Sequence, residues 1–129
     1  MKDSEQIAFN RFRKSKAEIK NAELALKENL YDQVISASYY AILHSARALL
    51  AINEIPVKKH AGVMSLFALH FVKTGVIDTE YSKILVTANR LRTSSDYSDY
   101  YFATQEEAVE ILESAKVFVG KIESILNFQ

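Results

Sequence analysis

The sequence predicts an all-α protein, an up-and-down bundle of four long helices with one additional short helix. Apolar residues recur with helical spacing through most of the 129 residues. Only three glycines and one proline interrupt the chain, so long helices can run unbroken. No segment sustains the alternation of apolar and polar residues that is typical of a strand. Residues 1–129 are therefore expected to form a single helical domain.

The first helix is expected over residues 3–27, where an apolar face repeats in alternating steps of four and three. The opposite face is rich in Lys, Glu and Arg. The apolar face consists of Ala8, Phe12, Ser15, Ile19, Ala22 and Leu26. The sequence ENLYD then makes a turn.

The second helix, expected over residues 31–53, is apolar around most of its circumference and should lie at the centre of the bundle. Its polar residues fall within about 120° of arc on a helical wheel. They are Asp32, Ser36, Tyr40, His44 and Arg47. One interpretation is a solvent-facing strip on a central helix. The other is a set of contacts to an anion or nucleotide, for which Tyr40, His44 and Arg47 are suitable side chains.

A short third helix is expected over residues 61–73, after Pro56 stops the second. His70 lies on its apolar face and is expected in the core, and Gly75 should cap the C-terminus. Just before the helix come Lys58, Lys59 and His60. His60 could simply begin the helix, or the three side chains could hold a phosphate at its N-terminus.

A fourth helix begins near residue 78 and turns Tyr81, Ile84, Leu85, Ala88 and Leu91 inward. The stretch LRTSSDYSDYYFAT, residues 91–104, is expected to interrupt it. Thr104 and Glu107 have the spacing of a capping box, which begins a fifth helix. The apolar seam of that helix is Ala108, Ile111, Leu112, Ala115, Val119, Ile122 and Leu126.

Arg92 falls inside the apolar seam of the fourth helix. A charged group in such a position must be paired or must border a cavity, because an unpaired buried charge is very costly. Asp96 follows four residues later, at the spacing of a helical ion pair. Either the pair is a structural salt bridge that closes the helix, or Arg92 forms the base of a polar cleft.

Composition excludes several functions. Sixteen basic and sixteen acidic residues cancel, so nucleic acid could bind only at a local patch. The absence of cysteine excludes disulfides and thiolate catalysis and fits a cytoplasmic protein. No apolar run reaches the roughly 18 residues of a membrane span, so no membrane association is expected. The histidines lack metal-ligand spacing and no phosphate-binding loop is present, so we expect neither a metal nor a cofactor.

Three blocks of the chain together resemble the HEPN family, in particular its small stand-alone prokaryotic members. They are ASYYAILHSARALL (37–50), KHAGVMSLFALHFVKTG (59–75) and LRTSSDYSDYY (91–101). The resemblance implies a helical bundle that forms a homodimer. It also implies a minimal nucleotidyltransferase as partner, the two proteins forming a toxin–antitoxin pair.

Many HEPN proteins are metal-independent ribonucleases whose motif is an arginine, four to six residues, then a histidine. Arg92 matches the arginine, but Tyr97, preceded by Asp96, stands where the histidine would be. Some relatives carry a tyrosine, two residues past the histidine, that the partner modifies; that position here is Asp99. Histidine suits acid–base catalysis near neutral pH, whereas a tyrosine hydroxyl ordinarily titrates near pH 10. His44 could replace the missing histidine if the second helix faces the fourth.

Three functions follow from this resemblance. The first is a protein that binds nucleotide or single-stranded RNA without cutting it and acts with the nucleotidyltransferase. The second is a ribonuclease toxin with a variant site made of Arg92, Asp96 and Tyr97. The third is a non-catalytic dimeric scaffold. The missing histidine favours the first, for which the expected binding residues are Tyr40, His44, Arg47, Lys58, Lys59, His60 and Tyr100.

Overall fold

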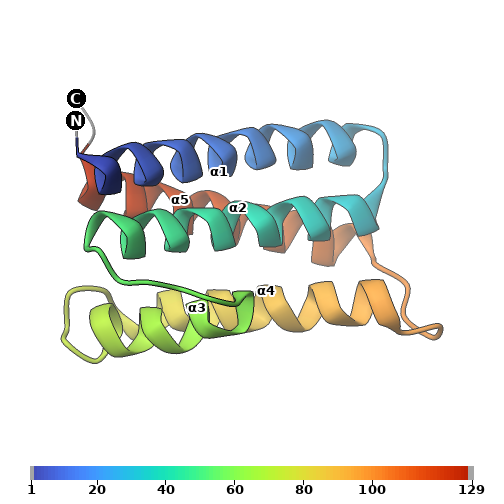
Figure 1. Cartoon of the computed structure of the whole chain (residues 1–129). Coiled ribbons are helices and arrows are strands. Elements are labelled where there is room, and N and C mark those ends of the chain that lie inside the picture. The colour runs from blue at the N-terminus through green and yellow to red at the C-terminus, as the bar shows by residue number, and fades with distance from the viewer. Residues whose placement is uncertain (1, 128–129) are drawn as a thin grey trace.

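The computed structural model describes residues 2–127, without the side chains of His60 and Ala61, and that part of the chain contains five α-helices and no strand (Figure 1). The helices are α1 (Asp3–Lys27), α2 (Tyr31–Ile52), α3 (His60–Phe67), α4 (Thr79–Tyr97) and α5 (Gln105–Leu126), with a π-helical segment η1 (Ala68–Val72) after α3. The predicted all-α bundle is confirmed.

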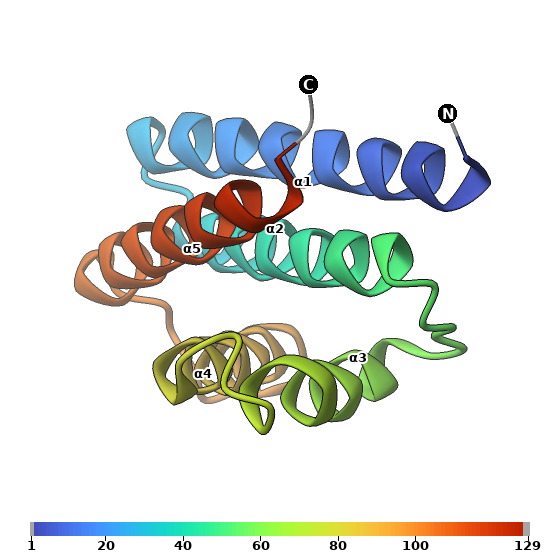
Figure 2. The ribbon, with the colours of Figure 1, turned by 90° about the vertical axis from the view of Figure 1, so that its left-hand side faces the viewer.

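The helices form three layers, as Figures 1 and 2 show from two directions. The helix α1 covers one side of the layer made by α2 and α5, and α3, η1 and α4 cover the other side. The central helix α2 contacts α1, α3, α4 and α5. This position explains why α2 is apolar around most of its circumference: it has neighbours on nearly every side.

Small side chains let α1 and α2 pack closely. Ala8, Ser15 and Ala22 recur every seventh residue along α1 and are fully buried. The buried hydroxyl of Ser15 donates a hydrogen bond of 2.6 Å to the backbone carbonyl of Ala41 on α2. The turn between the two helices uses Asn29 in the left-handed backbone region, with φ of 59°. Asparagine tolerates this conformation better than most residues.

An aromatic cluster joins α3, α4 and α5. Phe118 of α5 is fully buried, and its ring centroid lies 5.4 Å from that of Phe67 and 6.1 Å from that of Tyr81. These spacings suit attractive ring pairs. Phe118 was missing from the predicted seam of the fifth helix, whose buried face is wider than the spacing of its aliphatic residues indicated.

The prediction that His70 lies in the core is wrong, because the helix widens at η1. The N–H of Lys73 donates to the carbonyl of Ala68, five residues back, at 2.8 Å. This extra residue in the turn changes which side chains face inward: Phe71 is buried, while His70 is exposed. Gly75 ends the segment with φ of 82°, in the left-handed region expected of a cap.

The predicted interruption of the fourth helix begins later than expected. The helix α4 continues through Tyr97, so Arg92, Asp96 and Tyr97 are all helical. Only residues 98–104 form a connection. The predicted capping box at the start of α5 is confirmed, since the hydroxyl of Thr104 accepts from the N–H of Glu107 and the Glu107 carboxylate accepts from the N–H of Thr104.

Candidate nucleotide-binding site

Arg92 lies where α4 packs against α2. Its guanidinium carbon is 4.6 Å from the centre of the Tyr39 ring on α2, close enough for a cation–π interaction. Its Nη1 is 3.4 Å from Oδ2 of Asp96, one turn further along α4. Only 19% of the Arg92 side chain is exposed. The arginine is therefore held from two sides, by an aromatic ring and by a carboxylate.

The electrostatics keep Arg92 charged. Burial lowers the pKa of its guanidinium, but the charge interaction and hydrogen bond with Tyr39, together with the hydrogen bond to Asp96, outweigh this, and the pKa is raised. The Nε of Arg92 is buried and has no hydrogen-bond partner among the described residues. A positively charged group with donors to spare is a suitable contact for a phosphate.

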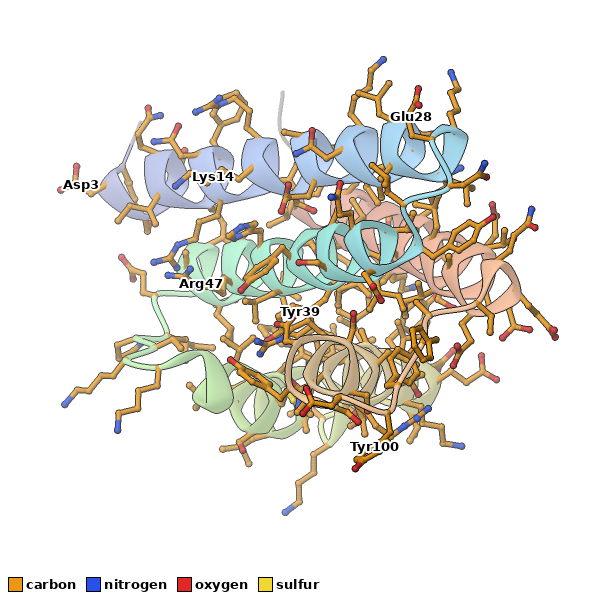
Figure 3. All side chains as sticks on the ribbon, turned by 90° about the vertical axis from the view of Figure 1, so that its right-hand side faces the viewer. Asp3, Lys14, Glu28, Tyr39, Arg47 and Tyr100 are labelled. Atoms are coloured by element: carbon orange, nitrogen blue, oxygen red, sulfur yellow. The ribbon has the colours of Figure 1, made fainter. Side chains whose placement is uncertain are left out.

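The predicted polar strip of α2 lies on the helix whose Tyr39 and Arg47 are labelled in Figure 3. Tyr40 and His44 are half-buried, and their ring centroids are 6.0 Å apart. Tyr40 also interacts electrostatically with Arg92. Tyr39 meets Tyr40 edge to face, with centroids 5.1 Å apart. The structure thus brings Tyr40, His44 and Arg92 to one face.

Arg47 extends the polar strip of α2 and contacts a second arginine, Arg11, which the sequence did not single out. Nη1 of Arg11, on α1, donates to the backbone carbonyl of Arg47 at 3.3 Å. Burial lowers the pKa of Arg11, and the positive charge of Arg47 lowers it further. On a helical wheel Arg11 borders the apolar face of α1, three residues after Ala8, whereas its exposed neighbour Arg13 lies on the opposite side. The contact of Arg11 with Arg47, however, depends on the packing of α1 on α2.

The tyrosines of the 97–102 segment have different roles. Tyr97 and Tyr100 project into solvent, with 76% and 95% exposure. Tyr101 instead donates a hydrogen bond of 3.0 Å to Oε1 of Glu107. Burial, together with Glu107, raises the pKa of Tyr101 to about 12. Within residues 2–127, no hydrogen bond, ion pair or ring contact links Tyr97, Tyr100 or Tyr101 to Arg92.

The other predicted basic group lies on the connection before α3. Lys58 and Lys59 are exposed there, and Lys59 is the N-terminal flanking residue of α3 with extended backbone. The side chain of His60 lies outside the described residues. Lys58 and Lys59 are available to an anion, but no contact in the described structure joins them to Arg92.

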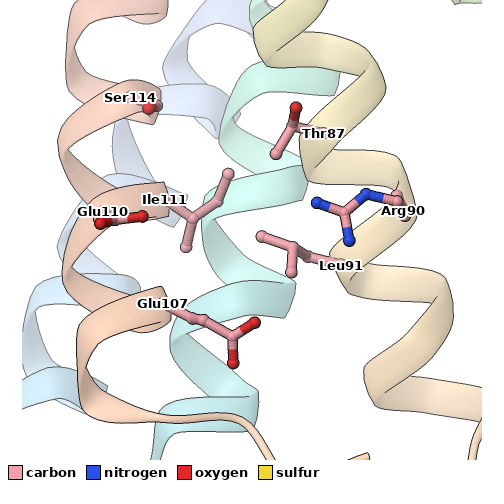
Figure 4. Close-up of a pocket in the computed structure, with 7 residues that line it drawn as sticks. All are labelled: Thr87, Arg90, Leu91, Glu107, Glu110, Ile111 and Ser114. Carbon is pink, nitrogen blue, oxygen red and sulfur yellow. The ribbon is translucent and has the colours of Figure 1, made fainter.

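A separate cleft of about 150 Å³ lies between α4 and α5 (Figure 4). Arg90 faces it from α4, and Glu107 and Glu110 face it from α5. Its lining therefore carries one positive and two negative side chains, a balance that disfavours a phosphate. Among the described residues, no three His, Cys, Asp or Glu side chains come together as a metal site would require.

The sequence pattern of the HEPN domain matches residues 10–125 of the chain, which is most of its length. The chain belongs to the HEPN domain family. A protein of Methanocaldococcus jannaschii with the name "Putative toxin MJ0605" is 39% identical over 106 residues, 82% of this chain and 78% of that protein. A "UPF0332 protein" of Archaeoglobus fulgidus is 32% identical over 117 residues, 91% of this chain and 93% of that protein.

Solved structures support the fold of this HEPN chain. The crystal structure of ST0689, an archaeal HEPN homologue, superposes with a TM-score of 0.68 and covers 98% of this chain and 100% of that one. The two sequences are 16% identical, so this likeness concerns the fold alone. None of the helices in residues 2–127 has both the length and the apolar character needed to cross a bilayer.

Proposed function

We propose that this HEPN protein binds nucleotide or single-stranded RNA through the face that carries Arg92, without cleaving RNA efficiently. The observation that carries the proposal is the state of Arg92: charged, held against Tyr39 and Asp96, and with a buried Nε that no described group satisfies. A phosphate oxygen is a strong acceptor and can contact this guanidinium through the part of the side chain that is exposed. Tyr40 supplies an adjacent ring on which a base could stack.

We propose further that the protein acts with a nucleotidyltransferase partner in a toxin–antitoxin pair. Two relatives from Methanocaldococcus jannaschii, at 39% and 31% identity, are named "Putative toxin MJ0605" and "Putative toxin MJ0142", which supports a role of this type. A pull-down of the tagged protein with the product of a neighbouring nucleotidyltransferase gene tests the partnership. Intact-mass measurement of the recovered chain then tests for an added nucleotide.

Weak cleavage follows from the residues around Arg92. Transesterification of RNA needs a base for the 2′-hydroxyl and an acid for the leaving oxygen. Tyr97, in the position of the missing histidine, is largely exposed, and no described side chain lies within hydrogen-bond distance of its hydroxyl to activate it. The toxin names of the relatives favour a second candidate, a ribonuclease in which His44 supplies the titrating group.

The test incubates the protein, without metal, with labelled single-stranded RNA and measures both retention and fragments. We expect retention that weakens about tenfold in Arg92→Gln, the loss typical of one charge-assisted contact, and little fragmentation. Robust cleavage that disappears in Arg92→Gln and His44→Gln would establish the ribonuclease instead. If the wild-type protein retained neither RNA nor nucleotide, the scaffold function would replace both.

A further inference from the structure

The pair of arginines at the junction of α1 and α2 is not part of the Arg92 contact. Arg11 and Arg47 approach closely enough for Nη1 of Arg11 to donate to the Arg47 carbonyl, at 3.3 Å. That distance ends at the backbone of Arg47, but the positive charge of the Arg47 side chain is near enough to lower the pKa of Arg11, so the two guanidinium groups repel. Half-burial strengthens the repulsion because less water screens the charges. Among the described residues, no carboxylate lies within ion-pair distance of either guanidinium. An anion bound between them would relieve the repulsion.

The donors at this junction are only partly used. Nε of Arg47 is buried without a hydrogen-bond partner among the described residues, the same condition as Nε of Arg92. Glu54 lines the same cleft as Arg11, but no ion pair joins the two in the described part of the chain. Arg47 and Arg92 thus each carry a guanidinium that the described residues satisfy only in part. A ligand with more than one anionic group could contact both arginines.

The two places lie on one face and at a distance that fits such a ligand. Tyr40 interacts with Arg92, and Arg47 lies seven residues further along α2. At a rise of 1.5 Å per residue, the two positions are about 10 Å apart along the helix axis. His44, whose ring centroid is 6.0 Å from that of Tyr40, lies between these two positions on α2. This separation exceeds the size of one phosphate group, so a single mononucleotide phosphate cannot contact both ends.

We propose that Arg11 and Arg47 form a second phosphate subsite, so that the ligand of this face is a single-stranded oligonucleotide that runs along α2 from Arg92 toward α1. This inference rests on the proposed function and adds the ligand class to it. Arg92 and the Arg11–Arg47 pair contact different phosphates of one strand, and Tyr40 and His44 contact the segment between them.

The experiment compares two ligands, uridine monophosphate and a labelled oligouridylate of about eight nucleotides, within the usual range of single-strand site sizes. Affinities are measured for the wild type and for Arg11→Gln, Arg47→Gln and Arg92→Gln. Arg13→Gln is the matched control, because Arg13 is an exposed arginine on the same helix α1. Circular dichroism checks that each variant is folded. If Arg47→Gln does not fold, Arg11→Gln and its charge-retaining counterpart Arg11→Lys decide the outcome.

We expect Arg11→Gln and Arg47→Gln to weaken oligouridylate binding about tenfold each and to leave the mononucleotide unaffected. The slope of log affinity against log salt should fall by about 0.7 for each phosphate that a variant no longer neutralises. Arg92→Gln should weaken both ligands, Arg13→Gln neither, and Arg11→Lys should recover most of the affinity. Oligouridylate binding that depends on Arg92 but not on Arg11 or Arg47 would overturn this inference and leave the proposed function intact. Failure of the wild type to bind either ligand would overturn both.

Discussion

At the scale of single residues, sequence spacing predicted one of the contacts of Arg92 and could not predict the other. Asp96 follows at the helical ion-pair spacing, and the two side chains do meet. Tyr39 comes from another helix, and only the packing of α4 on α2 places its ring against the guanidinium. Arg11 was missed for the same reason, because its neighbour Arg47 is distant in the sequence. Spacing predicts local pairs, whereas contacts between helices require the fold.

The first residue-scale prediction concerns the coupling of Arg92 and Asp96. Replacing both residues with alanine should cost less stability than the sum of the two single changes, by about 0.5 kcal/mol, because the pair is a partly exposed helical ion pair. Arg92→Ala alone should cost more than Asp96→Ala, since it also removes the contact with Tyr39, worth about 0.5–1 kcal/mol. Urea unfolding of the four proteins measures these differences. Strictly additive free energies would mean that the two side chains do not interact.

At the scale of elements, apolar periodicity predicted the five helices. The two wrong predictions, a buried His70 and an early end of the fourth helix, concern places where a helix changes its geometry or lacks an apolar face. A π turn alters the register without any sequence signal, so the helical wheel placed both His70 and Phe71 inside, whereas only Phe71 is buried. Residues 92–97 are mostly polar, and such a composition is typical of a loop. The segment is helical because the backbone of α4 simply continues, with Ser95 donating a hydrogen bond of 2.9 Å to Asp32 of α2.

The element-scale prediction concerns the capping box that begins α5. Thr104→Ala should reduce the free energy of unfolding by about 1 kcal/mol, because the N–H of Glu107 loses its acceptor. Glu107 also receives hydrogen bonds from Tyr101 and from the backbone of Thr104, so the variant should loosen the 98–104 connection as well. Thr104→Ser retains the hydroxyl and serves as the control. Denaturant unfolding measures both, and equal stability of Thr104→Ala and wild type would contradict the role of the cap.

At the scale of the whole molecule, the bundle buries two hydrophobic clusters, a large one and a smaller one between α1, α2 and α5, but leaves large apolar side chains exposed. Tyr97 and Phe102 are 76% and 84% exposed, and Val86 of α4 is about half exposed. Single exposed apolar residues are ordinary on a protein surface. Several exposed aromatic side chains within residues 97–102, at the C-terminal end of α4 and in the connection after it, are less ordinary and suit a contact with another chain. The sequence showed that these tyrosines are unusual, but it could not show which of them are exposed.

The whole-molecule prediction is that the protein forms a homodimer through the face of α4 that carries Arg92, as the family resemblance implies. Light scattering should then give about twice the chain mass of 14.6 kDa. Tyr97→Asp should dissociate the dimer, because it places a charge where an aromatic ring is expected to be buried between the two chains. Val117→Asp is the matched control: Val117 is an exposed apolar residue on α5, away from the segment that contains Tyr97. Both positions are exposed in the single chain, so neither change should unfold it.

A monomer at micromolar concentration would refute the prediction of a homodimer. Dissociation by Val117→Asp but not by Tyr97→Asp would move the interface from α4 to α5.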